Sequence, residues 1–138
     1  MRIINVGIDV GSTTVKLIAM DNDEILFKDY QRHFSNTLKT IQSLLAEFLK
    51  VVKKDDSFRI AFTGSGALAL AEFLNVPFVQ EVIACKNATL NYASNIDVVV
   101  ELGGEDAKII YFTNGIEQRM NGSCAGGTGA FLDQMAVL

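Results

Sequence analysis

Two stretches of the chain place a carboxylate shortly before a turn of small residues. They are DVGSTTVKLIAMDN, which begins at Asp9, and ELGGEDAKIIYFTN, which begins at Glu101, and they align without a gap. Small residues let a tight turn direct its backbone N–H groups outward, where they bind an anion, and hydroxyl groups add donors. A carboxylate repels phosphate unless Mg²⁺ lies between them, and Mg²⁺ prefers few carboxylates together with substrate oxygens. The pair of stretches therefore predicts two turns that hold the β- and γ-phosphates of a nucleotide.

The residues of these turns have different expected roles. Asp9 and Glu101 are expected to bind Mg²⁺ through water, and Asp106 is a candidate for orienting an attacking water. Lys16 and Lys108 either contact phosphate or are solvated strand residues. The hydroxyl donors of the first turn are Ser12, Thr13 and Thr14. One such turn alone is usually only a hairpin, so the hypothesis depends on the pair, and the sequence has no Walker A motif.

Composition limits the kinds of protein that the chain can be. Its 138 residues, 49% of them hydrophobic, suffice for a compact core. Twelve basic and sixteen acidic residues give a net charge of −4, and the basic residues are scattered, so nucleic acid is not an expected partner. No segment reads as a signal peptide or membrane span. Two cysteines are too few for a disulfide framework, which indicates the reducing cytoplasm.

The pattern of apolar and turn residues predicts strands alternating with helices. Apolar residues recur at spacings of three and four between Leu38 and Val52, which is typical of an amphipathic helix, and Pro77 prevents a helix from continuing. The expected strands are 2–10, 14–20, 24–34, 58–64, 96–104, 107–112 and 115–120, and the expected helices are 36–54, 65–75, 79–93 and 127–138. This is an α/β fold, and a three-stranded meander followed by α/β units indicates the ribonuclease-H-like order.

Five segments, in this order and spacing, resemble the BadF/BadG/BcrA/BcrD-type ATPases, which include activators of 2-hydroxyacyl-CoA dehydratases and subunits of benzoyl-CoA reductases. The segments are GIDVGSTTVK, TGSGALALAEFL, VQEVIACKNA, ELGGEDAKII and MNGSCAGGTGAFL. The resemblance implies the ATPase fold shared by actin, hexokinase and the heat-shock chaperones. It also implies ATP, Mg²⁺ and a homodimer bridged by one [4Fe-4S] cluster.

The resemblance assigns residues to these groups. It implies a first phosphate loop of Asp9, Gly11, Ser12, Thr13 and Thr14, with Lys16 as a further nucleotide contact, and a second loop of Glu101, Gly103, Gly104 and Asp106. Cys124 matches a cluster ligand. A helix N-terminus next to this cysteine would stabilise the negative charge of a thiolate-ligated cluster. ATP hydrolysis would then drive one electron to a CoA-ester dehydratase or reductase.

The chain also departs from the family pattern. A second cluster cysteine and an adenosine-binding loop are expected further along the family's length, so we interpret the chain as an N-terminal fragment, with half-domains at 1–94 and 95–138. Glu101 stands where aspartate is usual, and TGSGA stands where many members have an aromatic residue and an arginine. The apolar residues of the last helix are expected to be exposed or to meet a second copy; they are Phe131, Leu132, Met135 and Leu138.

Two other functions stay open at this stage. The first is a small-molecule kinase on the same fold, against which the cysteine in CAGGTG argues. The second is a nucleotide-binding module without turnover. For His33, the single histidine, we expect a structural role at a surface or half-buried position, and for Cys85 a buried structural position.

Overall fold

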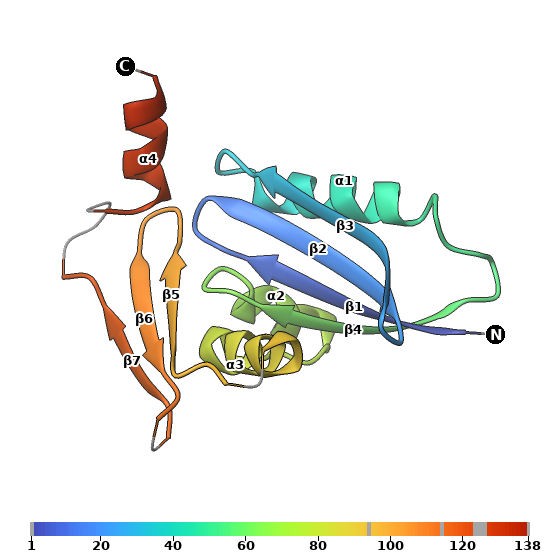
Figure 1. The fold of residues 1–138 in the computed structure, drawn as a ribbon. Helices are drawn as coiled ribbons and strands as arrows, with labels where there is room; N and C mark the ends of the chain where they lie inside the picture. Colours follow the sequence, from blue (N-terminus) through green and yellow to red (C-terminus); the bar gives the residue numbers. More distant parts are fainter. Residues whose placement is uncertain (1, 94, 114, 123–126, 138) are drawn as a thin grey trace. The chain divides into compact units, whose positions relative to one another are not determined.

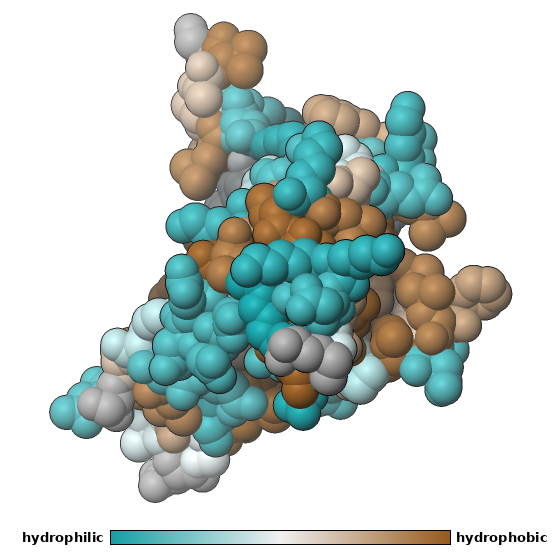
Figure 2. Space-filling model, turned by 90° about the vertical axis from the view of Figure 1, so that its right-hand side faces the viewer, coloured by the Kyte–Doolittle hydropathy of each residue, from teal (hydrophilic) through white to brown (hydrophobic). Residues whose placement is uncertain are grey.

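The computed structural model describes residues 2–93, 95–113, 115–122 and 127–137, and its chain divides into two compact units, Met1–Val79 and Gln80–Leu138. Each unit is described by itself. The domain boundary expected near residue 94 stays a prediction. Among the described residues, no helix has both the length and the hydropathy that a membrane span needs. Hydrophilic and apolar side chains are mixed across the face drawn in Figure 2.

The first unit is a four-stranded sheet with helices (Figure 1). Its elements are β1 (Ile3–Val10), β2 (Thr14–Asp21), β3 (Glu24–Arg32), α1 (Thr37–Phe48), β4 (Ser57–Thr63) and α2 (Leu68–Leu74). The strand order is β3-β2-β1-β4, in which β1 pairs antiparallel with β2 and parallel with β4. A meander whose first strand then pairs with β4 is the arrangement that the element order predicted.

The core of this unit lies on one face of the sheet. Alternate residues of β1 are buried, from Ile4 to Val10, because successive side chains of a strand point to opposite faces. They pack in one cluster with buried side chains of α1, among them Ile41, Leu44 and Phe48. Helix α1 ends at Phe48 rather than at the expected residue 54, and Val52 reaches the same core from the loop that follows.

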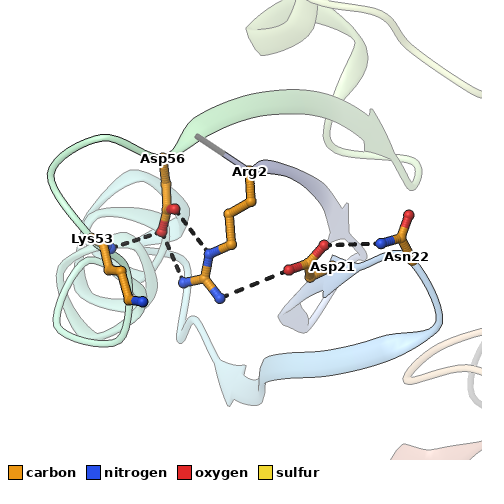
Figure 3. A network of polar contacts seen from close by, with 5 residues as sticks. All are labelled: Arg2, Asp21, Asn22, Lys53 and Asp56. Atoms are coloured by element: carbon orange, nitrogen blue, oxygen red, sulfur yellow. Dashed lines mark hydrogen bonds and ion pairs between the residues drawn. The ribbon is translucent and has the colours of Figure 1, made fainter.

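An ion-pair network at the base of the sheet joins β1 to β4 (Figure 3). The Arg2 guanidinium donates to both carboxylate oxygens of Asp56, at 2.9 and 2.8 Å, and the Lys53 amide donates to the same carboxylate at 2.8 Å. The hydrogen bond from Arg2, followed by that from Lys53, lowers the pKa of Asp56 to about 2. The backbone amide of Ser57 also donates to the carbonyl of Arg2. The network therefore fixes the parallel register that brings the far ends of β1 and β4 together.

The second unit contains α3 (Glu81–Tyr92), a three-stranded antiparallel sheet and α4 (Gly129–Ala136). The sheet has the order β5-β6-β7, with β5 at Val98–Leu102, β6 at Ala107–Tyr111 and β7 at Glu117–Met120. In its described part, only Ile110 and Thr128 are buried.

Three apolar side chains of α4 are exposed by about half, as expected; they are Phe131, Leu132 and Met135. Leu138 lies outside the described residues. The expectation that Cys85 is buried was wrong, because its side chain is only half-buried. None of the twelve residues of α3 is buried.

Candidate phosphate-binding turns

The first turn joins β1 to β2 and is closed by a hydrogen bond from the Gly11 amide to the Thr14 carbonyl, at 2.9 Å. Asp9 and Lys16 lie directly opposite each other in the antiparallel ladder, and Lys16 Nζ is 2.7 Å from Asp9 Oδ2. Thr14 is buried, whereas Ser12 is exposed and Thr13 half-exposed. The structure thus brings the predicted residues of the first loop together, with Lys16 paired to the carboxylate.

His33 contacts this turn in a structural role, but it is buried rather than at the surface or half-buried position expected. Its ring is buried, its Nδ1 accepts a hydrogen bond from the Ser35 amide at 3.1 Å, and its Nε2 lies 3.2 Å from the Gly11 carbonyl. Because Nδ1 accepts, the proton lies on Nε2 and is donated to Gly11. The His33 amide also donates to the Thr13 carbonyl at 3.1 Å. His33 therefore stabilises the turn through hydrogen bonds to the carbonyls of Gly11 and Thr13.

The end of β4 closes over Asp9. Thr63 is the residue of β4 opposite Asp9, and Gly64 follows it with a φ of +95°. A Cβ on Gly64 would lie 2.4 Å from both Asp9 Oδ1 and the Val10 carbonyl oxygen, so only glycine fits here. Asp9 Oδ1 and Thr63 Oγ1 are both buried without a hydrogen-bond partner in the described part of the chain. Unpaired buried polar atoms are costly, so each calls for an explanation, of which a bound ligand or ion is one.

The second turn, between β5 and β6, has the same construction. The Gly103 amide donates to the Asp106 carbonyl at 2.8 Å, as Gly11 does to Thr14. Glu101 lies opposite Lys108 in the ladder, as Asp9 lies opposite Lys16. The similarity between the two sequence stretches is therefore also a similarity of backbone and charge placement.

The lysine of the second turn has a different partner from its counterpart. Lys108 Nζ donates to Glu81 Oε2 on α3 at 2.6 Å and is 3.8 Å from Glu101 Oε1. Burial acts to lower the pKa of Lys108, but the hydrogen bond to Glu81 and the charges of Glu101 and Asp106 outweigh it, so the pKa lies above its ordinary value. Lys108 is therefore a charged lysine whose side chain is only 13% exposed.

The first turn of α4 is attached to the second phosphate turn. The amide of Gly129 donates to the Gly103 carbonyl at 2.8 Å, and the amide of Ala130 donates to the Gly104 carbonyl at 3.0 Å. Thr128 at the N-cap is fully buried, and its Oγ1 has no partner among the residues described. Cys124, the predicted cluster ligand, lies outside the described residues.

The two turns have the donors and acceptors that a phosphate with Mg²⁺ requires. The turn amides of Ser12, Thr13, Gly104 and Glu105 donate to no acceptor among the described residues. The unpartnered Asp9 Oδ1 and the Glu101 carboxylate are hard oxygen ligands of the kind that Mg²⁺ prefers. No group of three or more His, Cys, Asp or Glu side chains in the described segments could hold a metal ion. A Mg²⁺ that uses few carboxylates plus phosphate oxygens and water is compatible with the carboxylate of each turn taken by itself.

Sequence reasoning missed Glu81, Thr63 and Gly64 as parts of these turns. Glu81 is an acidic residue in the first turn of a helix, where acids are favoured on any helix. Its residue type therefore does not indicate that it contacts a lysine of the turn. Thr63 and Gly64 lie beside Asp9 only because β4 pairs in parallel with β1.

Comparison with solved structures defines the class of fold. The crystal structure of component A of the (R)-2-hydroxyglutaryl-CoA dehydratase from Acidaminococcus fermentans matches with a TM-score of 0.77 and 33% identity, over 98% of this chain and 53% of that chain. The activator of the 2-hydroxyisocaproyl-CoA dehydratase from Clostridium difficile, with bound ADPNP, matches with a TM-score of 0.72 at 23% identity, over 97% and 51%. The ethanolamine utilization protein EutJ from Carboxydothermus hydrogenoformans matches with a TM-score of 0.65 at 13% identity, over 97% and 57%. The chain has the actin-like ATPase fold, as predicted.

Sequence comparison identifies the family. The model of the BadF/BadG/BcrA/BcrD ATPase family matches residues 6–138. The (R)-2-hydroxyglutaryl-CoA dehydratase activating ATPase of Acidaminococcus fermentans is 34% identical over 141 residues, which cover 99% of this chain and 54% of that relative. The 2-hydroxyisocaproyl-CoA dehydratase activator of Clostridioides difficile is 28% identical over 139 residues, 96% of this chain and 51% of that relative. This chain belongs to the BadF/BadG/BcrA/BcrD ATPase family, and it spans about half the length of these relatives.

Proposed function

We propose that the chain forms the phosphate-binding part of a Mg²⁺-dependent ATPase that activates a 2-hydroxyacyl-CoA dehydratase or a related reductase. The single observation that carries nucleotide binding is the repeated turn, in which a strand-end carboxylate, an opposing lysine and unpaired turn amides occur twice. The names of the relatives support the choice of a dehydratase activator.

In this proposal the turn amides and hydroxyls bind the phosphates, and Asp9 and Glu101 bind Mg²⁺ through water. The bound Mg²⁺ would neutralise charge on the β- and γ-phosphate oxygens. Asp106 is the proposed acceptor that orients the attacking water, since it lies in the second turn. Gly11, Gly103 and Gly104 leave room for the phosphates to approach the backbone.

The proposed route for the electron passes through a [4Fe-4S] cluster with Cys124 as a ligand. A homodimer would supply the same cysteine from each copy, and the exposed apolar side chains of α4 are a suitable surface for a second copy. The cluster and the dehydratase partner are proposed from the family and its named relatives, and the homodimer from the family and the exposed face of α4.

A second candidate is a module that binds nucleotide without hydrolysing it. Lys16 pairs with Asp9 at 2.7 Å, and the other oxygen of that carboxylate is covered. The Asp9 carboxylate therefore stabilises the turn through its ion pair with Lys16, and it would keep this structural role in a protein that binds nucleotide without hydrolysing it.

Nucleotide binding is tested with a fluorescent ATP analogue, titrated with and without Mg²⁺. The Mg²⁺-dependent gain in affinity is expected in the wild type and in Glu117→Gln, a control that removes an acid paired with Arg119 on β7. The gain should be lost in Asp9→Asn and in Glu101→Gln. Saturable binding that is equal in all four proteins would show that these carboxylates do not hold Mg²⁺, and an absence of binding in the wild type would refute the proposal.

The cluster is tested by anaerobic reconstitution followed by iron and acid-labile sulfide assays. Wild type and Cys85→Ser should bind iron and sulfide, and Cys124→Ser should not. Equal iron in the two cysteine variants would exclude a specific role for Cys124. Phosphate release in the loaded wild type then separates the ATPase from the module without turnover.

A further inference from the structure

The two turns differ in how their lysines are held, although they agree in sequence and register. Lys16 contacts its opposing carboxylate directly, with 2.7 Å between Nζ and Asp9 Oδ2. Lys108 lies 3.8 Å from Glu101 and makes its close contact, at 2.6 Å, with Glu81. The difference between the two turns is therefore the presence of a second acid, which α3 places beside the lysine.

Glu81 competes with Glu101 for one ammonium group. Both carboxylates belong to half-buried residues, with side chains 32% and 33% exposed, so neither is favoured by its contact with water. The shorter contact leaves the charge of Glu101 only partly neutralised. A carboxylate free of a close ion pair attracts a hydrated cation more strongly than one that already accepts a hydrogen bond from lysine, so of the two proposed Mg²⁺ ligands Glu101 is the stronger and the lysine-paired Asp9 the weaker.

We propose that Glu81 is a positioning residue of the second phosphate turn, which holds Lys108 away from Glu101 and thereby keeps Glu101 available to Mg²⁺. The inference rests on the proposed function, since it concerns the same site. It also gives helix α3 a part in nucleotide binding, because the acid that holds the lysine lies in its first turn. Without Glu81, Lys108 would pair with Glu101 as Lys16 pairs with Asp9.

The first test is the Mg²⁺ concentration that gives half of the maximal gain in nucleotide affinity. In Glu81→Gln this concentration should rise about tenfold, the size expected when one charge-assisted hydrogen bond must be broken. In the double variant Glu81→Gln/Lys108→Met it should return to within about twofold of the wild-type value, because no lysine remains to compete. Glu117→Gln serves as the control for loss of one acidic charge from the same unit. A merely structural role of Glu81 predicts no such recovery, and an unchanged concentration in Glu81→Gln would overturn the proposal.

The second test needs no nucleotide. A crystal structure of Glu81→Gln without ligand should show Lys108 Nζ within hydrogen-bond distance of Glu101, about 3 Å or less. Lys108 remaining in its present position would overturn the inference whatever the nucleotide assays give. If Lys108 moves and the wild type binds no nucleotide, the placement of the lysine by Glu81 is supported and the proposed function fails.

Discussion

Replacement of Gly64 by alanine tests the packing of β4 against the first phosphate turn. Gly64 has a φ of +95°, a region in which a side chain costs about 1–2 kcal/mol. The new Cβ would lie 2.4 Å from Asp9 Oδ1 and from the Val10 carbonyl oxygen, whereas ordinary contact begins at 3.4 Å. The end of β4 must therefore shift by roughly 1 Å to restore ordinary contact. Dispersion contacts and hydrogen bonds are weakened by a shift of this size. The substitution therefore destabilises the fold in two ways, through the unfavourable φ of residue 64 and through the overlap of its Cβ with Asp9 and Val10.

The expected loss of stability follows from these two contributions. A shift of this size breaks the hydrogen bond of 2.9 Å from the Gly66 amide to the Val10 carbonyl, at a cost of about 1 kcal/mol. With the backbone cost, the free energy of unfolding should fall by about 2–3 kcal/mol. For a unit of this size, that corresponds to a decrease in Tm of roughly 8 to 24 °C.

The assay is urea unfolding followed by far-ultraviolet circular dichroism, with hydrogen exchange of β1 amides to locate the loss in the first unit. Gly66→Ala is the matched control, because its Cβ would meet the Val10 side chain at 3.1 Å and the Val10 carbonyl oxygen at 3.3 Å, contacts that are tight but do not overlap as those of Gly64 do. It should cost less than half as much as Gly64→Ala. Equal stability of Gly64→Ala and wild type would refute the close packing of β4 on Asp9.

Three further predictions concern other parts of the first unit. Thr63→Val should raise the free energy of unfolding by about 1 kcal/mol, because a methyl group replaces a buried, unpartnered hydroxyl; a loss of stability in thermal unfolding would contradict this. Asp56→Asn should be less stable than wild type near neutral pH, since the lowered pKa of Asp56 stabilises the fold above pH 3.8. The difference in stability should vanish as the pH falls from about 4 to 2. Asp55→Asn is the control. Phe48→Ala should cost about 3–5 kcal/mol in urea unfolding, because its ring is 3% exposed and packs on Phe27 and Phe58, whereas Phe73→Ala at an 85% exposed site should be nearly neutral.

The order and type of all elements could be predicted, because each depends on a local pattern. Alternation identified the strands, and the three-and-four spacing from Leu38 identified α1. The ends were less accurate where tertiary contacts decide them. Residues 65–67 are not helical, because Gly64 and Gly66 bring the chain back against Val10 before α2 begins.

Some residues of the candidate site could likewise be predicted from a local pattern, and others depend on tertiary contacts. The turns that contain Asp9, Gly11, Glu101 and Gly103 could be predicted because carboxylate and turn lie close together in sequence, and their role in binding phosphate stays a prediction. Glu81 was missed because its contact with Lys108 spans 27 residues and depends on the packing of a helix. No local pattern encodes such a pair.

The attachment of α4 to the second turn has a mechanical consequence. A helix begins with amides that lack acceptors inside the helix, and here the first two amides of α4 have the carbonyls of Gly103 and Gly104 as acceptors. The loop and the helix thus share one set of hydrogen bonds, so the loop cannot change shape without either moving the helix or leaving amides unpaired. A ligand that changes the shape of this turn would therefore also displace the first turn of α4.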